Sequence, residues 1–330
     1  MQLSLARFRP SPLATVARAS IAVPWRRLLF IAGFVAINLG MLAHPGVRYL
    51  MVLPHDWTAF TELPVRVSQG TIYEPGYWFV WSPVAAWLLA YVFVPLGYSW
   101  WLGLHLASVV LIRNWKLVIL SILAVPLWVD TIGGNAFVFA FVAGAVALRG
   151  GRWGALSYLA ICCLMPRPVQ APLAFWLLWQ RPETRVPFGA MVLLTIGFAT
   201  WGDMLDNWVT NLTAIGVSNS DHFANLAPTK IFGSAWFLVG IPIAAWLTAL
   251  GRPGLAGLVL TPYALPGYVI VLLWDGWEGA GHPAVDRRVT FPRLSLVPLL
   301  RTMSLWIPAI PRFQDPRQRA PAKVVSNAEE

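Results

Sequence analysis

Long apolar stretches follow one another along most of this chain, separated by short polar breaks. A helix needs about 20 mainly apolar residues to cross a membrane. The apolar runs, in chain order, are 28–43, 78–96, 98–112, 117–129, 136–148, 155–165, 169–179, 188–205, 231–250 and 255–274, with 294–310 as a further candidate. Several runs are short and contain or adjoin proline, as broken helices at membrane depth do where protein covers their backbone. The pattern predicts an all-α polytopic membrane protein, a bundle of about 9–11 transmembrane helices.

Two longer polar segments interrupt this pattern. Residues 44–77 carry charged side chains and several prolines, and we interpret them as a first outer loop with short helices on the membrane surface. Residues 206–230 are predicted to form a long outer loop. The predicted organisation is a basic cytoplasmic N-terminus (1–27), a transmembrane domain (28–274) and a C-terminal segment (275–330) that holds the candidate span 294–310 and a disordered basic tail.

Composition narrows the class of protein. Of 330 residues, 58% are hydrophobic and only 12% are charged, whereas about 25% of the residues in soluble domains are charged. A water-soluble enzyme is therefore excluded. A disulfide-stapled domain is excluded as well, because the two cysteines, Cys162 and Cys163, are adjacent. The 19 tryptophans fit a membrane protein, because the indole ring favours the membrane–water interface.

The net charge of +10 indicates membrane topology and no nucleic-acid partner, because the basic residues are dispersed between apolar runs. Basic residues lie at every second break: Arg113 and Lys116, Arg149 and Arg152, Arg181 and Arg185, and Arg252. By the positive-inside rule these breaks and the N-terminus are cytoplasmic. We therefore expect a multi-pass protein of the cytoplasmic (cell) membrane. Whether 79–112 makes one crossing or two stays open at this point, and two crossings would reverse the side of every later loop.

Acids are scarce, with 14 in the chain, and Asp56 stands out by its position. It follows the first apolar run and precedes Trp57. A carboxylate among aromatic side chains at a membrane surface can act as a general base; the alternative is a solvated loop acid or a helix N-cap. Asp130 and Asp203 lie at the ends of apolar runs, where we expect water to reach them. His105, inside an apolar run, is either functional or a hydrogen-bonded histidine between helices.

The residues around Asp56 resemble the opening signature of the glycosyltransferase family 87 membrane proteins. That signature has an acid–aromatic pair after the first span, then a Gly-x-x-Tyr, and then an aromatic segment with x-Pro that opens the next apolar run. Here Asp56, Gly70, Tyr73 and Ser82-Pro83 fall on those places, and the resemblance covers residues 28–270. Family members are polyprenyl-phosphate-sugar-dependent transferases, including phosphatidylinositol mannosyltransferases. They share the glycosyltransferase-C (GT-C) architecture, in which the first outer loop of a multi-span bundle supplies the catalytic acid.

Two later positions depart from the family pattern. The family has a Gly-Gln-x-Asn turn before a short span, and here Ile132-Gly133-Gly134-Asn135 keeps Gly and Asn but has no Gln. The family has Lys-Pro near the end of a later span, and here Arg167 takes the place of the lysine. The departures at Gly134 and Arg167 leave open an inactive family member that acts as a scaffold.

The resemblance implies the inverting transfer of a sugar, mannose or another hexose or pentose, from a polyprenyl phosphate to a lipid or glycan hydroxyl. Asp56 would be the catalytic base, and fixed cations would stabilise the departing lipid phosphate. The candidate residues for binding the donor phosphate or substrate are Arg167, Arg66, Lys230, Tyr73, His55, His222 and Asn135. The chemistry requires no metal or other cofactor, because a phosphate ester is already a good leaving group. The expected partners are membrane lipids, the lipid-linked donor and the acceptor, and the oligomeric state stays open.

A transporter or flippase of lipid-linked sugars is the alternative class. Such a protein should carry ionisable residues at mid-span and repeated halves. The acids of this chain cluster at span ends and in loops, and we find no internal repeat. Sugar transfer is therefore the favoured hypothesis.

Overall fold

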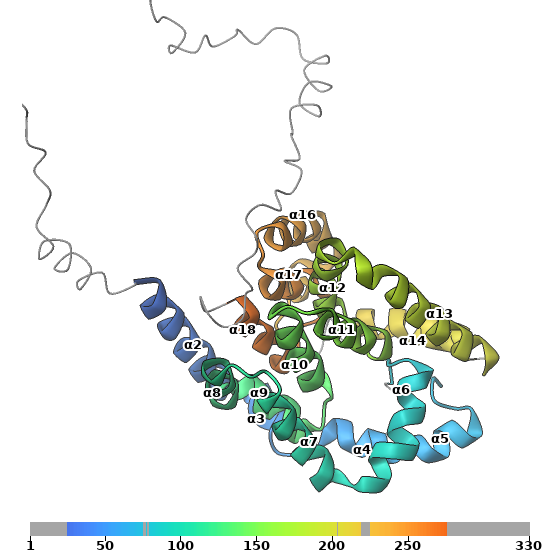
Figure 1. Cartoon of the computed structure of the whole chain (residues 1–330). Coiled ribbons are helices and arrows are strands. Elements are labelled where there is room, and N and C mark those ends of the chain that lie inside the picture. The colour runs from blue at the N-terminus through green and yellow to red at the C-terminus, as the bar shows by residue number, and fades with distance from the viewer. Residues whose placement is uncertain (1–24, 75–76, 78, 203, 219–224, 276–330) are drawn as a thin grey trace, which may run out of the picture. The chain divides into compact units, whose positions relative to one another are not determined.

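The computed structural model describes residues 25–74, 77, 79–202, 204–218 and 225–275, and every regular element among them is helical. With the labels of Figure 1, the α-helices are α2 (Trp25–Ala43), α3 (Pro45–Leu50), α4 (His55–Thr61), α5 (Leu63–Gln69), α6 (Pro83–Leu88), α7 (Tyr98–Val110), α8 (Trp115–Leu123), α9 (Val125–Gly133), α10 (Phe137–Leu148), α11 (Arg152–Leu164), α12 (Ala171–Gln180), α13 (Arg185–Trp201), α14 (Leu205–Ser218), α15 (Thr229–Phe232), α16 (Trp236–Ala249), α17 (Pro253–Leu260) and α18 (Leu272–Asp275). A π-helical segment, Leu89–Phe93, and the 3₁₀ segments Val94–Leu96, Pro168–Gln170, Pro182–Thr184, Gly233–Ala235 and Pro266–Val271 connect them. The predicted all-α class is confirmed for the described residues.

Few of these helices are long enough to cross a membrane alone. Two helical segments of the described chain qualify by length and composition, Pro182–Trp201 and Thr229–Ala249. Three sharply bent pairs raise the number to five if each pair is one span: Leu28–Ala43 with Pro45–Gln69, Pro83–Leu96 with Tyr98–Val110, and Trp115–Leu123 with Val125–Gly133. The described residues thus contain two to five candidate spans, which is compatible with a helical membrane protein.

The apolar runs overstated the length of individual helices. Run 117–129 is not one helix, because it breaks before Pro126 and its halves are bent by 69°. Run 255–274 is interrupted in the same way by Pro262 and Pro266. Proline lacks the backbone N–H that would continue the helical ladder, so these runs divide into shorter pieces.

The long outer loop was only partly predicted. Residues 206–230 begin within α14 and end within α15, so helical structure takes up much of the expected loop. The predicted N-terminal segment up to residue 24, the candidate span 294–310 and the rest of the C-terminal segment from residue 276 lie outside the described residues.

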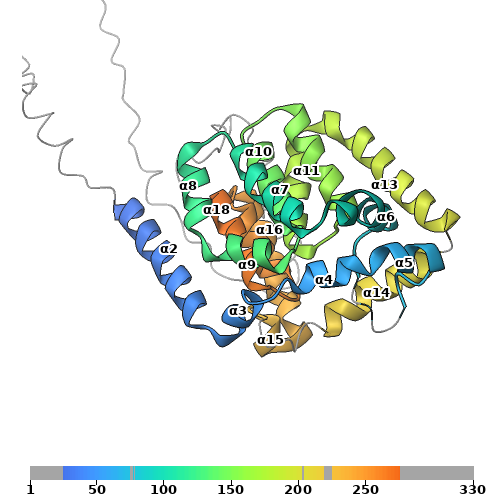
Figure 2. The same ribbon diagram turned by 90° about the horizontal axis from the view of Figure 1, so that it is seen from below.

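Helix α10 is the centre of the larger core. Almost all of its side chains are buried, and it packs against α7, α11 and α18 (Figure 2). The ring of Trp274 stacks on Phe141 and lies so close to Gly144 that a Cβ there would come within 2.3 Å of the indole. A helix that is apolar on all sides belongs in a protein interior or a membrane, which explains how this short helix can run through the middle of the bundle.

The outer helices, by contrast, expose apolar side chains. Val186 on α13 is 82% exposed, and Leu238 on α16 is 81% exposed. Soluble monomers rarely present large contiguous apolar surfaces. The exposed faces of α13 and α16 therefore fit contact with lipid, in agreement with the length of the helical segments Pro182–Trp201 and Thr229–Ala249 that contain them.

The turns of the bundle gather at two ends. At one end, which we call the basic end, Arg149 donates a hydrogen bond to the carbonyl of Ile112, and the Arg181 side chain lies beside Gly150. The other end, which we call the site end, contains the turn before α10, the turn before α12 and the first loop. Three of the basic breaks in the sequence, at 113–116, 149–152 and 181–185, are thus close in space.

The pair formed by α6 and α7 makes one net passage between these ends. The N–H of Ser82, just before α6, donates to the carbonyl of Leu164 (2.9 Å), and the hydroxyl of Tyr98, at the start of α7, donates to the carbonyl of Ile132 (2.6 Å). The first half of the pair therefore begins and ends at the site end, and α7 alone runs to the basic end. The two halves are bent by 107°, so the pair counts as one candidate span if it forms a single broken crossing.

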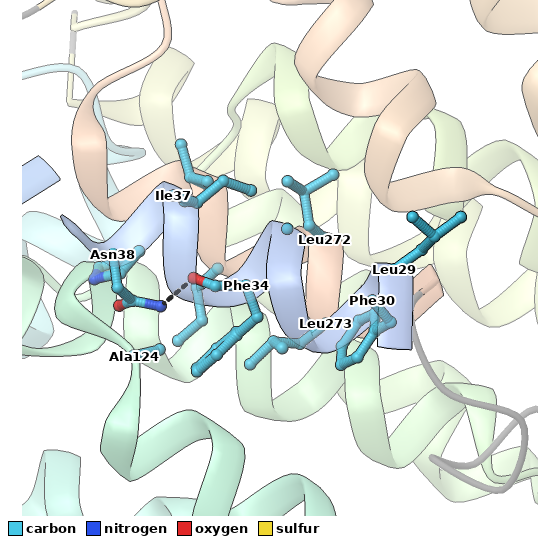
Figure 3. A pocket seen from close by; sticks show the side chains of 12 residues that line it. Leu29, Phe30, Phe34, Ile37, Asn38, Ala124, Leu272 and Leu273 are labelled. Carbon is cyan, nitrogen blue, oxygen red and sulfur yellow. Dashed lines mark hydrogen bonds between the residues drawn. The ribbon is translucent and has the colours of Figure 1, made fainter. Parts of the chain in front are cut away.

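An apolar groove of about 230 Å³ lies between α2 and the segment that leads into α18 (Figure 3). Asn38 is its polar member. The Nδ2 of Asn38 donates to the carbonyl of Phe34 (2.7 Å), and its Oδ1 accepts the N–H of Val125 (2.6 Å). Val125 is the first residue of α9, where a backbone N–H has no partner within the helix. Asn38 therefore stabilises the break between α8 and α9.

Replacing Asn38 by leucine should destabilise the protein by about 1–3 kcal/mol, because the N–H of Val125 would lose its acceptor in apolar surroundings. The measurement is the midpoint of thermal unfolding of the detergent-purified protein. Ile37→Val is the matched control, since Ile37 lines the same groove and the change removes no hydrogen bond. Equal midpoints for Asn38→Leu and the wild type would contradict this role.

Candidate functional site

The first loop is fixed to the bundle by aromatic packing. Helix α4 begins after its cap residue Pro54 and buries Trp57. The ring of Trp57 lies 5.7 Å from that of Trp101 and 5.8 Å from that of Tyr98, both on α7. This packing holds the first turn of α4, which carries Asp56, at the site end. The alternative that Asp56 is an N-cap is wrong, because Pro54 occupies that position.

The turn between α9 and α10 touches α4 directly. Gly134 has a left-handed conformation (φ 80°), and a Cβ there would come within 2.7 Å of the Cβ of Trp57. The N–H of the next residue, Asn135, donates to the carbonyl of Asp130 (2.8 Å), and its own carbonyl lies 2.9 Å from Nε2 of His105. Glycine suits a left-handed turn that another backbone approaches closely. His105 is thus a hydrogen-bonded histidine between helices, and it helps to position Asn135.

Arg167 reaches the same region from the turn between α11 and α12. Its backbone N–H donates to Oε1 of Gln170 (3.0 Å), and its Nη2 donates to Oδ1 of Asn135 (3.1 Å). The guanidinium carbon lies 5.1 Å from the ring centre of Tyr268 and 5.8 Å from that of Trp81. Hydrogen bonding and aromatic faces together hold the planar guanidinium in one orientation.

Asp56 completes this group of side chains. It is half-buried, and burial raises the pKa of its carboxyl above the ordinary aspartate value, while the charge of Arg167, the neighbouring His55 and a hydrogen bond with the Asn135 side chain act in the opposite direction. A carboxylate with a raised pKa beside a fixed cation is a candidate general base. The structure thus brings together four predicted site residues, which we call the Asp56 cluster: Asp56, His55, Asn135 and Arg167.

Asp130 is a neighbour of this cluster that sequence reasoning missed. We expected water to reach it, and that expectation is wrong, because the residue is only 3% exposed. Its carboxylate lies against Gly267, where a Cβ would come within 2.0 Å of it, and within electrostatic reach of Asp56 and Arg167. The bend before Pro126 turns α9 inward and carries Asp130 into the bundle. The one sequence feature that pointed to a role for Asp130 was its position just before the Gly-Gly-Asn turn.

Two predicted residues of the first loop have other partners. Tyr73 is buried and its hydroxyl donates to the carbonyl of Trp81 (2.7 Å), and burial raises the pKa of that hydroxyl. Arg66 forms an ion pair with Glu62 (3.0 Å) and lies over the ring of Tyr77 at 4.0 Å. Both side chains therefore stabilise the shape of the loop, and these contacts do not bring them into the Asp56 cluster.

The remaining predicted residues lie elsewhere in the chain. Lys230 is exposed on α15. His222 and Asp203 lie outside the described residues. Among the residues that the structure describes, no three His, Cys, Asp or Glu side chains lie close enough together to hold a metal ion.

A cavity of about 400 Å³ opens beside Arg167. Arg167 and Gln170 supply polar groups to its wall, and the rest of the lining is largely apolar, including Ala174, Leu212 and Tyr263. Cavities of roughly 300–1,000 Å³ are typical of small-molecule sites. Its wall thus combines a largely apolar surface with the positive charge of Arg167.

Comparison of the chain with family models, curated proteins and solved structures gives no match. The resemblance to glycosyltransferase family 87 rests on the sequence motifs alone.

Proposed function

We propose that this protein is a membrane glycosyltransferase that moves a sugar from a polyprenyl phosphate to a hydroxyl group of a lipid or glycan acceptor. The observation that carries the proposal is the convergence of Asp56, Asn135 and Arg167 from three separate segments, beside a largely apolar cavity. Transfer from a lipid phosphate needs a proton acceptor, a cation at the leaving group and space for an apolar chain. These three requirements coincide at the site end.

In the proposed reaction, Asp56 accepts the proton of the acceptor hydroxyl while that oxygen forms a bond to the anomeric carbon of the sugar. The bond between this carbon and the phosphate oxygen breaks, and the lipid phosphate leaves with the electron pair. Arg167 stabilises the negative charge that develops on the phosphate, and Asn135 keeps the guanidinium aimed. Attack from the face opposite the phosphate inverts the anomeric configuration.

The proposal includes the placement of the protein in a membrane. The site end faces the outer side of the cytoplasmic membrane, and the basic end and the N-terminus face the cytoplasm. The bundle is of GT-C type, with about 9–11 helices that enter or cross the membrane, the short ones covered by their neighbours. The reaction needs no metal ion or other cofactor.

One observation favours transport of the same lipid-linked sugar as a second candidate function. Asp130 is an acid buried between helices, and ionisable residues of this kind mark transport pathways in membrane proteins. An inactive protein that acts as a scaffold is the third possibility, since Gly134 and Arg167 depart from the family pattern.

One experiment separates these functions. The full-length protein is reconstituted in lipid vesicles with polyprenyl-phosphate hexoses and pentoses and with glycolipid acceptors, and the products are measured by mass spectrometry. We expect glycosylated acceptor and an equal amount of free polyprenyl phosphate. Movement of intact donor across the vesicle bilayer without product would favour the transporter, and neither result with any donor would favour the scaffold.

Replacing Arg167 by glutamine should lower kcat/KM by about 10²–10³-fold, because the charge on the leaving phosphate loses its fixed cation. It should also move the acid limb of the pH profile to higher pH. Asp56 acts only when it is deprotonated, and the charge of Arg167 lowers its pKa, so removal of that charge raises the pH at which Asp56 loses its proton.

Arg167→Lys is the matched control for this pH effect. Lysine keeps the charge and should leave the acid limb near that of the wild type, although it loses the planar fork that binds Asn135 and should lower the rate. His55 and Asp130, the other titratable groups near Asp56, are unchanged in both variants. The same acid limb in Arg167→Gln and the wild type would contradict the coupling between Arg167 and Asp56.

A further inference from the structure

The turn that carries Arg167 presents two buried hydrogen-bond donors without a partner among the described residues. Gln170 is 1% exposed, and its Oε1 accepts the N–H of Arg167 (3.0 Å), which fixes the direction of its amide. The Nε2 of Gln170 and the Nε of Arg167 are both buried and have no hydrogen-bond partner in the described part of the chain. Buried donors are nearly always paired in folded proteins, so two such donors on one turn point to a ligand.

Both residues line the 400 Å³ cavity. Two N–H donors and one positive charge complement an oxyanion, and hydrogen bonds between charged groups are stronger than neutral ones. The remaining wall, with Ala174, Leu212 and Tyr263, is largely apolar and suits a hydrocarbon chain. A free inorganic ion would lose its hydration water in this cavity, and it has no hydrocarbon chain whose contacts with the apolar wall would offset that cost.

We propose that Gln170 is a substrate-selecting residue, which binds together with Arg167 the phosphate of a single-chain lipid phosphate whose tail lies along the apolar wall. This inference rests on the proposed function for the chemical class of the donor. It adds a residue that neither the family motifs nor the charge pattern indicated. Because the backbone of the same turn orients the Gln170 amide, this side chain is ordered before the ligand binds, which lowers the entropic cost of binding.

The test measures binding to the full-length protein in detergent by calorimetry, with no sugar present. The probes are farnesyl phosphate, farnesol and inorganic phosphate. Gln170→Glu keeps an oxygen that accepts the Arg167 N–H, and it replaces the free donor by a carboxylate that repels phosphate. Gln180→Glu is the matched control, because it makes the same change at the end of α12 and outside the lining of the cavity.

We expect the wild type and Gln180→Glu to bind farnesyl phosphate equally, and Gln170→Glu to bind it about 10- to 100-fold more weakly. Farnesol should bind weakly and alike to all three proteins, which shows that the cavity is intact. Inorganic phosphate should bind far more weakly than farnesyl phosphate. If the glutamate variant loses its thermal unfolding transition, Gln170→Met replaces it in the test, because methionine keeps the side-chain volume. Gln170→Met should show the same loss of farnesyl phosphate binding.

Three results would overturn the inference: unchanged binding of farnesyl phosphate by the Gln170 variants, equal binding of farnesol and farnesyl phosphate by the wild type, or inorganic phosphate binding as tightly as the lipid. The test is independent of sugar transfer. Binding that depends on Gln170 in a protein without transferase activity would support this inference and contradict the proposed function. Sugar transfer with binding that is indifferent to Gln170 would do the reverse.

Discussion

Asp56→Asn should reduce sugar transfer by about 10²–10⁴-fold, because an amide cannot take the proton of the acceptor hydroxyl. The same variant should fold at least as well as the wild type. Burial raises the pKa of Asp56, so the fold disfavours its charged form, and stability is lost as the pH rises through that raised pKa. At neutral pH a neutral amide removes this penalty. The measurements are the transfer rate per mole of reconstituted protein and the amount of protein in the membrane.

Glu62→Gln is the matched control for Asp56→Asn. Glu62 lies in the same loop, and its ion pair with Arg66 is exposed, so its loss should change stability little. We expect this variant to transfer sugar at nearly the wild-type rate. Full transfer by Asp56→Asn would remove Asp56 from the mechanism, and a strong decrease in its membrane abundance would assign it a structural role.

The association of Asp56 with Asn135 and Arg167 could be predicted in outline from the sequence. The alternation of basic breaks placed the first loop and the Arg167 turn on one side of the membrane. The family motifs selected Asp56 and Asn135 within that side. Turns on the same side of a bundle lie at one end of it, so their residues can make contact. The hydrogen bond from Arg167 to Asn135 is such a contact.

Other parts of the site could not be predicted, because they depend on bends and on packing direction. An apolar run shows neither where a helix breaks nor which way it turns afterwards, and the burial of Asp130 follows from the bend before Pro126. The unpaired donor of Gln170 follows from one local hydrogen bond. Tyr73 matched a motif, yet its hydroxyl bonds to the carbonyl of Trp81, because motif spacing does not fix the direction of a side chain.

Gly134→Ala should have the second largest effect, on both stability and activity. The left-handed backbone at Gly134 costs alanine about 1–2 kcal/mol. The new Cβ would also lie 2.7 Å from the Cβ and 2.9 Å from the backbone nitrogen of Trp57. Because the backbone of α4 cannot rotate away as a side chain can, α4 has to shift. Overpacking of this kind adds about 1–3 kcal/mol, so we expect a lower midpoint of thermal unfolding.

The activity should fall for a geometric reason, because Asp56 precedes Trp57 on the helix that has to move, and Asn135 follows Gly134. A displacement of about 1 Å between catalytic groups can reduce a rate about 10²-fold. Gly70→Ala separates strain from displacement, since Gly70, at the end of α5 in the loop that carries Asp56, has a similar φ of 72° and nothing within 4 Å of a Cβ. It should lose some stability but keep its transfer rate. Equal activity of Gly134→Ala and Gly70→Ala would show that the contact between Gly134 and Trp57 does not position Asp56.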